Sequence, residues 1–304
     1  MSRTQEIKKR AHTILVTDSG LGGLSVFTEI ANRLKAGSPW QRVNLVYFNA
    51  WPEVDRGYNH LPDMDTKARV FHNAMTAMAV HEPDRIFIAC NTLSVIYPLT
   101  RFSTETHIEV TGIVDDGAAM IHQELVNTPD SRVIIFGTPT TTSARSHEIR
   151  LKKMGIKKNR IINQGCINLA GKIERNPYSD IVPEMIDDNV KQAAAKMETI
   201  QGRVFAALCC THFGYCRDLF VAAVKKYITD DVVILNPNKA MAHRALAHGA
   251  PVTNHPDISM HIVSRIPWET SRIDAYSRML KDISPETVDA LGRYELNPEL
   301  FDII

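Results

Sequence analysis

The chain repeats a pattern of apolar segments that end in polar residues, at an interval of about 120 residues. ILVTDSG begins at residue 14 and VIIFGTP at residue 133, an offset of 119. Cys90 and Cys210 each follow an apolar run, at an offset of 120. VTGIVDDGAAM begins at residue 110 and VVILNPNKAM at residue 232, an offset of 122. Three nearly equal offsets predict two similar units, although roughly even spacing of strands is common to α/β chains.

Short apolar segments alternate with amphipathic ones along the whole chain. The segments with strand character are 13–17, 43–48, 85–89, 108–114, 132–137, 160–163, 203–208 and 231–235. Helical patterns lie between them, at 24–34, 64–80 and 181–198 among others. Continuous apolar strands separated by helices are typical of parallel sheets covered on both faces. The sequence therefore predicts an α/β fold of two pseudo-symmetric domains, each a parallel-rich sheet flanked by helices.

The repeat also predicts where the domains lie. We expect a first α/β domain at 12–125 and a second at 128–245. Residues 246–304 lie outside the repeat and form a C-terminal extension, which either completes the first domain or contributes to a homodimer contact. Within it, Ser284 is the expected N-cap of a helix with Pro285 at its first position, and IVSRIPWE is a candidate short strand ending near Trp268.

Composition excludes several classes of protein. A formal net charge of +1 gives no basic surface for nucleic acid. No apolar run approaches the roughly 20 residues that a membrane helix needs, and the N-terminus has the pattern of a charged tail before a strand, not of a signal peptide. The five cysteines are an odd number and sparse for 304 residues. They indicate reduced thiols and a cytoplasmic location, not a disulfide framework.

Polar and reactive residues stand at the ends of the matching strands. Ligands of open parallel sheets bind beyond the carboxyl ends of the strands, and here those ends carry Asp18-Ser19, Cys90-Asn91-Thr92, Thr138 and Cys210-Thr211-His212. Two facing domains would bring both cysteines to one cleft. A cysteine before a helix N-terminus has its thiolate favoured. One thiolate could then remove a proton from a carbon while the opposing thiol protonates the other face, which inverts that carbon without a cofactor.

Three segments resemble the signature segments of glutamate racemases, in the aspartate/glutamate racemase superfamily. They are VTDSGLGGLSV at 16–26, IACNTLS at 88–94 and CTHFG at 210–214. Their order and spacing agree with that family over roughly 12–245. The resemblance implies an active site in the cleft between two α/β domains. It also implies racemisation of an amino acid, most simply glutamate, without pyridoxal phosphate or metal, and thus a supply of D-glutamate for peptidoglycan.

The resemblance assigns roles residue by residue. Cys90 and Cys210 would be the acid/base pair, assisted by Asp18 beside Cys90 and by His212 beside Cys210. Glu174 would lie near the second cysteine, on a looser alignment. The expected partner is a small amino acid, and its binding residues would be Ser19, Asn49, Asn91, Thr92, Thr138, Thr141 and Thr211.

Some segments depart from the family pattern and leave the substrate open. Asn49 stands where the family usually has Asp, and Arg56-Gly57-Tyr58 is the nearest counterpart of a Pro-Tyr-Gly. Phe213-Gly214 and Asp115-Asp116 also differ from the usual residues. An isomerase of the same superfamily that acts on aspartate or another small carboxylate is therefore an alternative. A non-catalytic amino-acid-binding relative is another.

Other interpretations compete for the same residues. Most cysteines are inert core thiols, and this is the expected role of Cys166 and Cys209. Cys209, Cys210, His212 and Cys216 could be zinc ligands, but they lack a C-x₂-C pair, and adjacent residues of a strand point to opposite faces. SGLGGLS lacks the third glycine of a dinucleotide loop. It is expected to form a tight turn whose N–H groups face a carboxylate ligand.

Overall fold

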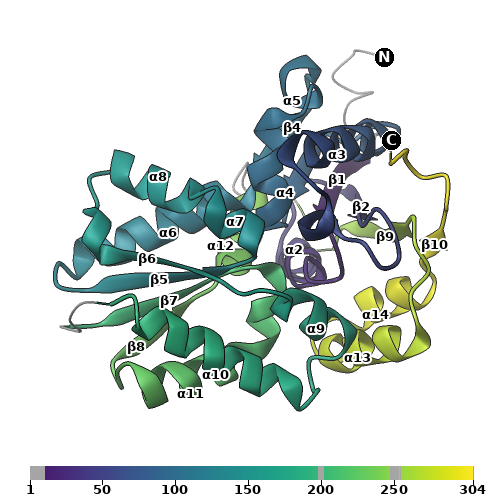
Figure 1. Ribbon diagram of the computed structural model, residues 1–304. Helices are drawn as coiled ribbons and strands as arrows, with labels where there is room; N and C mark the ends of the chain where they lie inside the picture. Colours follow the sequence, from purple (N-terminus) through teal and green to yellow (C-terminus); the bar gives the residue numbers. More distant parts are fainter. Residues whose placement is uncertain (1–10, 198–201, 247–252, 254, 304) are drawn as a thin grey trace.

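Two parallel sheets form the frame of the molecule in the computed structural model, which describes residues 11–197, 202–246, 253 and 255–303. The strands are β1 (His12–Asp18), β2 (Arg42–Asn49), β3 (Arg85–Ile88), β4 (Glu109–Gly112), β5 (Arg132–Gly137), β6 (Ile161–Gly165), β7 (Val204–Cys209), β8 (Val232–Leu235), β9 (Asp257–Ser264) and β10 (Glu295–Leu296). One sheet has the order β10-β9-β2-β1-β3-β4 and the other β6-β5-β7-β8, with every pair parallel (Figure 1). The predicted α/β fold is confirmed.

Helices cover both faces of each sheet. The α-helices are α2 (Leu24–Ala36), α3 (Met64–Ala79), α4 (Asn91–Ile96), α5 (Phe102–Glu105), α6 (Ile113–Asn127), α7 (Pro139–Ser143), α8 (Ser146–Lys153), α9 (Leu169–Arg175), α10 (Ile181–Ala194), α11 (Arg217–Tyr227), α12 (Pro237–Ala245), α13 (Thr270–Leu280) and α14 (Pro285–Gly292). Short 3₁₀ helices are η1 (Tyr58–His60), η2 (Tyr97–Leu99), η3 (Lys158–Arg160) and η4 (Thr211–Cys216). Within the described ranges, no helix is long and apolar enough to span a membrane.

The two sheets share one strand order. β2-β1-β3-β4 in the first corresponds to β6-β5-β7-β8 in the second, which is the pseudo-symmetry that the sequence offsets predict. Cys90 follows β3 and Cys210 follows β7, so the two thiols stand at equivalent strand ends.

Burial on both faces explains why these strands have no polar side. Along β1, Ile14 and Val16 pack into one core and Leu15 into the core on the opposite face. Along β7, Ala206 and Phe205 divide in the same way between two further cores. Successive side chains of a strand alternate between faces, so a strand covered on both sides is apolar throughout.

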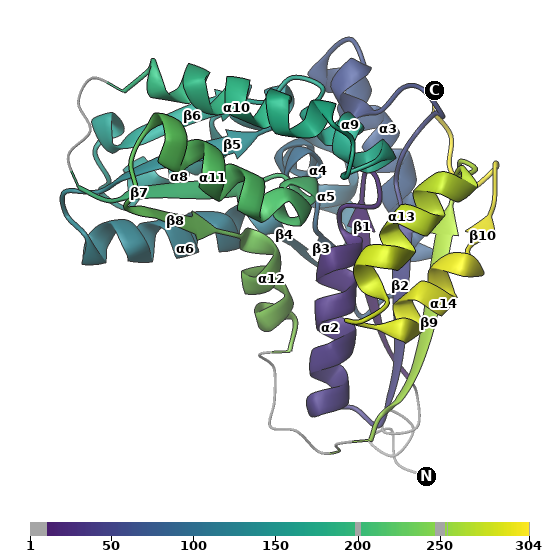
Figure 2. The same ribbon diagram turned by 90° about the horizontal axis from the view of Figure 1, so that it is seen from below.

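Two helices cross from one half of the molecule to the other. α6 follows β4 of the first sheet, but Ile121 and Leu125 pack with Val133 of the second. α12 follows β8 of the second sheet, but Met241 packs in the core of the first, where α12 lies against α2 (Figure 2). The boundaries 12–125 and 128–245 therefore separate the strands of the two sheets but do not separate these helices according to their packing. As a division into domains, they stay a prediction.

The C-terminal segment extends the first sheet. β9 pairs in parallel with β2 along its whole length, and β10 pairs with β9. The strand expected near Trp268 ends earlier, at Ser264. Ser284 caps α14 as predicted, because its side chain accepts a hydrogen bond from the Thr287 N–H. The expected homodimer contact stays a prediction.

Two expected elements end earlier than the sequence pattern suggested. The strand predicted over 108–114 stops at Gly112, where α6 begins with Asp115 and Asp116 in its first turn. Acidic residues favour a helix N-terminus. The helix predicted over 181–198 ends at Ala194, and residue 198 lies outside the described residues.

Candidate active site

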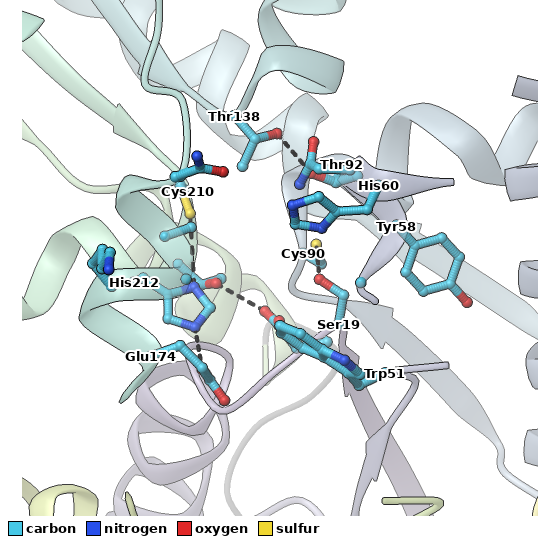
Figure 3. A pocket seen from close by; sticks show the side chains of 18 of the residues that line it. Ser19, Trp51, Tyr58, His60, Cys90, Thr92, Thr138, Glu174, Cys210 and His212 are labelled. Atoms are coloured by element: carbon cyan, nitrogen blue, oxygen red, sulfur yellow. Dashed lines mark hydrogen bonds and ion pairs between the residues drawn. The ribbon is translucent and has the colours of Figure 1, made fainter. Parts of the chain in front are cut away.

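A pocket of about 520 Å³ lies at the carboxyl ends of strands from both sheets. Both strand-end thiols line it, Cys90 from the first sheet and Cys210 from the second (Figure 3). The other predicted site residues in its lining are Asp18, Ser19, Asn91, Thr92, Thr138, Glu174, Thr211 and His212. The structure thus brings together residues that are up to about 190 positions apart in the chain.

Asn49 and Thr141 are predicted site residues that support the lining without forming part of it. The Asn49 side-chain oxygen accepts a hydrogen bond of 2.7 Å from the Trp51 N–H. The Thr141 hydroxyl lies 3.0 Å from that of Thr138, which in turn lies 2.8 Å from that of Thr92. These contacts fix the residues that face the pocket.

Cys90 is the N-cap residue of α4 and lies beside Ser19. Its Sγ is 3.2 Å from the Ser19 Oγ (Figure 3). Burial raises the pKa of the Cys90 thiol to about 12, the charge of Asp18 adds to this, and hydrogen bonds from Ser19 and the Leu93 N–H oppose it. The helix terminus was expected to favour the thiolate. Burial outweighs it in the unliganded pocket.

Cys210 lies at the start of a hydrogen-bonded relay. Its Sγ is 3.7 Å from the Nδ1 of His212, whose Nε2 contacts the Glu174 carboxylate. Burial opposes charge on His212, but the hydrogen bonds to Cys210 and Glu174 raise its pKa well above the usual value. Burial likewise opposes charge on Glu174, but the His212 hydrogen bond holds the Glu174 pKa below its usual value. Both shifts favour an imidazolium paired with a carboxylate over two neutral groups.

Asp18 connects the two halves of the site. It is fully buried at the end of β1, and the Thr211 hydroxyl donates a hydrogen bond of 2.9 Å to its Oδ2. Its Oδ1 has no hydrogen-bond partner among the described residues. Burial raises the Asp18 pKa to about 7, although the charge of His212 lowers it. Asp18 therefore titrates near neutrality.

Replacing Asp18 with Asn is expected to stabilise the fold increasingly as pH rises. Because the pKa of Asp18 is raised from 3.8 to about 7, its stabilising contribution is complete below pH 4 and is lost as pH rises through 7. The loss amounts to at most about 4 kcal/mol. Denaturant unfolding at pH 5 and pH 8 measures it. A difference in unfolding free energy between the two proteins that is the same at both pH values would contradict the prediction.

The glycine-rich turn after β1 was expected to face a carboxylate ligand, but its Leu21 N–H faces a carboxylate of the protein itself. The Leu21 N–H donates to the Glu174 Oε2 at 3.0 Å. A Cβ atom on Gly22 would lie 2.4 Å from the Thr211 Oγ1 and 2.6 Å from the His212 Nδ1. Only glycine allows this turn to approach the relay so closely.

Replacing Gly22 with Ala is expected to cost about 1–3 kcal/mol of stability by overpacking. It should also lower any turnover at least about tenfold, because small displacements of reacting groups have large effects on rate. Thermal unfolding and steady-state kinetics measure both. Gly292→Ala is the control, since a Cβ atom there meets nothing within 4 Å. Equal behaviour of the two variants would refute the argument.

Within the described ranges, Asn91 places an unpaired amide in the lining of the pocket. It is 2% exposed and lines the pocket, and neither its side-chain oxygen nor its nitrogen has a partner among the described residues. Buried polar groups are normally hydrogen-bonded. A bound molecule with both a donor and an acceptor would satisfy this amide.

Sequence reasoning missed part of the lining. Trp51 and His60 lie on the Cys90 side of the pocket (Figure 3). The departure of 49–58 from the family pattern could have signalled this wall. Lys172, Arg175 and Arg272 also line the pocket, and Arg272 comes from the extension, where no motif marked it.

The remaining cysteines lie in the cores. Cys209 and Cys210 pack into different cores, as adjacent residues on a strand should. Cys216 and Cys166 are also buried, and Cys166 reaches the pocket lining. Across the described part of the chain, no group of three or more His, Cys, Asp or Glu side chains is placed to hold a metal ion.

Known proteins of similar sequence include glutamate racemases. No family model matches the chain. The glutamate racemase of Aquifex pyrophilus is 24% identical over 228 residues, which cover 75% of this chain and 79% of that protein. The chain is similar in sequence to the glutamate racemases.

Solved glutamate racemases share the fold. The isoform RacE1 from Bacillus anthracis superposes with a TM-score of 0.68 at 20% identity, covering 90% of this chain and 94% of that one. The glutamate racemase of Francisella tularensis, solved in complex with D-glutamate, gives 0.63 at 21% identity, with 89% and 94% covered. The predicted resemblance to glutamate racemases is confirmed.

Proposed function

We propose that the protein racemises glutamate without a cofactor, with Cys90 and Cys210 as the two acid/base groups. One observation carries the proposal: two thiols at equivalent strand ends line one pocket, and each has its own polar partner. Such a protein would act in the cytoplasm, where thiols stay reduced, and its D-glutamate would supply peptidoglycan.

The chemistry needs a thiolate on one side of the α-carbon and a thiol on the other. A thiolate takes the α-proton of the substrate, and the electron pair of the C–H bond stays on the α-carbon and spreads into the carboxylate. The opposing thiol gives its proton to the other face, which leaves an inverted substrate and the two sulfurs with exchanged protonation states. The reverse reaction starts from that exchanged state.

Substrate binding would activate Cys90. In the unliganded pocket, burial and the charge of Asp18 keep the thiol protonated. The ammonium group of an amino acid brings positive charge, which favours the ionised forms of both Asp18 and Cys90. Proton removal would thus be coupled to the arrival of the correct ligand.

Cys210 would have a positive charge beside it, whereas Cys90 has the negative charge of Asp18. The protonated His212 places a hydrogen-bond donor 3.7 Å from the Cys210 sulfur, and Glu174 keeps that proton on the ring by ion pairing. A cation beside a cysteine is the usual means of stabilising a thiolate. The two thiols therefore have different supports, although they occupy equivalent positions.

The lining fits an amino acid with an anionic side chain. Asn91 offers a donor and an acceptor without partners, and Ser19, Thr92 and Thr138 add hydroxyl groups. Lys172 and Arg175 bring positive charge to the same pocket, which favours a dicarboxylate over a neutral amino acid. The Francisella relative with D-glutamate bound supports glutamate as the substrate.

Chiral chromatography tests the proposal. Metal-free protein without pyridoxal phosphate is incubated with L-glutamate, L-aspartate and L-alanine in parallel, and each amino acid is separated into its enantiomers. Formation of D-glutamate supports the proposal. D-Aspartate alone would transfer the mechanism to another substrate, and calorimetric binding of glutamate with no inversion would indicate a non-catalytic relative.

A further inference from the structure

Glu174 receives contacts from three separate parts of the chain. The Leu21 N–H reaches it from the turn after β1, at 3.0 Å, and His212 contacts it from η4. The third set comes from α13, where the Tyr276 hydroxyl donates at 3.1 Å and the Arg272 guanidinium lies 3.7 Å away. Glu174 is 2% exposed, so these groups replace water around its carboxylate.

The two α13 residues form one face directed at this carboxylate. Arg272 and Tyr276 are four positions apart and therefore lie one above the other on the helix. Tyr276 is completely buried and packs edge-on against Tyr215. Arg272 is also buried, and its Nε has no hydrogen-bond partner within the described ranges.

α13 belongs to the segment that the internal repeat does not cover. The polar side chains that act on Cys90 are those of Ser19 and Asp18, at the end of β1, whereas the relay at Cys210 reaches a helix outside the repeat. The C-terminal segment therefore adds charge and hydrogen bonds to one half of a pseudo-symmetric site.

We propose that Arg272 and Tyr276 are positioning residues that keep Glu174 ionised and oriented, so that the shared proton stays on His212 beside Cys210. The assignment rests on the proposed function for the role of Cys210 in proton transfer. Neither residue needs to touch the substrate for this effect.

The charge distribution around Glu174 supports this division of roles. His212 and Arg272 supply positive charge to the carboxylate. Asp18 lies near enough for the two carboxylates to repel each other, and the charge of Glu174 raises the pKa of Asp18. Tyr47 and Tyr215 also lie near, but their hydroxyls donate to the backbone oxygens of Gly20 and Gly22. Arg272 and Tyr276 are thus the α13 groups that offset the repulsion from Asp18.

Two substitutions remove these groups, and two others on the same segment serve as controls. Arg272→Met and Tyr276→Phe take away the charge and the hydroxyl. Arg278→Met changes an exposed arginine on the same helix. Tyr294→Phe removes a hydroxyl that accepts a hydrogen bond from the Trp268 N–H, away from Glu174.

The acid limb of the pH profile is the first readout. Without Arg272 or the Tyr276 hydroxyl, the pKa of Glu174 rises, so the Glu174–His212 pair takes up a second proton at higher pH. The acid limb of kcat/KM should move upward by about one unit in Arg272→Met and by about half a unit in Tyr276→Phe. It should not move in either control. A lower kcat with an unmoved limb in both test variants would show a merely structural role and overturn the proposal.

A second readout needs no activity. The protein is labelled with glutamate carrying ¹³C at the side-chain carboxyl, and Glu174→Gln assigns the Glu174 signal. Its titration should move to higher pH in Arg272→Met and Tyr276→Phe and stay in place in the controls. If the signal moves but glutamate is not racemised, the proposed function fails and the assignment of α13 stands. If glutamate is racemised and neither the signal nor the limb moves, the assignment fails. If Arg272→Met does not fold, the assignment is tested with Tyr276→Phe alone, because this substitution removes a single oxygen and leaves the ring in place.

Discussion

Replacing either Cys90 or Cys210 with alanine is expected to reduce racemisation of glutamate by about 10³–10⁴-fold. A positioned general acid or base contributes typically 10²–10⁴ in rate, and in the proposed mechanism each thiol serves as base for one enantiomer and as acid for the other. Loss of one sulfur therefore disables both directions. Initial rates from L- and D-glutamate, measured by chiral chromatography, give the result.

The serine variants and a third cysteine provide the controls. Serine keeps a hydroxyl at the site, so Cys90→Ser and Cys210→Ser should retain slow proton exchange on the face of the remaining thiol. Cys216 is buried in the core, and Cys216→Ala should keep most of the activity. Near-normal turnover in either Cys90→Ala or Cys210→Ala would eliminate the two-thiol mechanism.

Replacing His212 with asparagine is expected to lower kcat by about 10²–10³-fold. The His212 Nδ1 lies 3.7 Å from the Cys210 sulfur, and the Glu174 contact favours the protonated ring by raising the His212 pKa. Asparagine could still bond to Glu174 but cannot carry the charge. Removing a single preorganised donor at a site of developing charge typically costs 10²–10³ in rate.

The same substitution at an exposed histidine serves as the control for His212→Asn. His243 lies on the solvent side of α12, and His243→Asn should behave as the unmodified protein does. Thermal unfolding shows whether His212→Asn remains folded. Folded His212→Asn with turnover within a few-fold of the unmodified protein would remove the relay from the mechanism.

The strands and their reactive ends were predictable because local pattern determines them. β1 and β7 are apolar on both faces since helices cover both sides, and this gives the runs from which the sheets were predicted. Residues at strand ends of one sheet, such as Asp18 and Cys90, then lie together because parallel strands end at one edge. Because the two sheets share one strand order, Cys90 and Cys210 stand at equivalent strand ends, and both line the pocket.

The packing of α6 against the second sheet and of α12 against the first was not predictable from local pattern. Both helices are amphipathic, and an apolar stripe shows that a helix is covered but not which sheet covers it. The predicted domains 12–125 and 128–245 kept each helix with the sheet that precedes it. The structure instead packs Leu125 beside Val133 and Met241 in the core of the first sheet.

The chemistry of the site was predictable only in part. The helix start at Cys90 was recognised from sequence, but the depth of burial that raises its pKa to about 12 is a tertiary property. Sequence analysis did not identify Arg272 and Tyr276 as site residues, because the C-terminal extension has no counterpart in the repeat and contains no motif. Their importance follows only from contact with Glu174, about 100 residues earlier in the chain.

The most direct test of the two-thiol account is the position of deuterium after partial racemisation in D₂O. L-Glutamate is converted to a few per cent, and the two enantiomers are separated and analysed by mass spectrometry. The account predicts deuterium at the α-carbon of the D-glutamate formed and protium in the recovered L-glutamate, because each face is served by a different sulfur. Equal deuterium in both enantiomers would mean that one base serves both faces, and would contradict it.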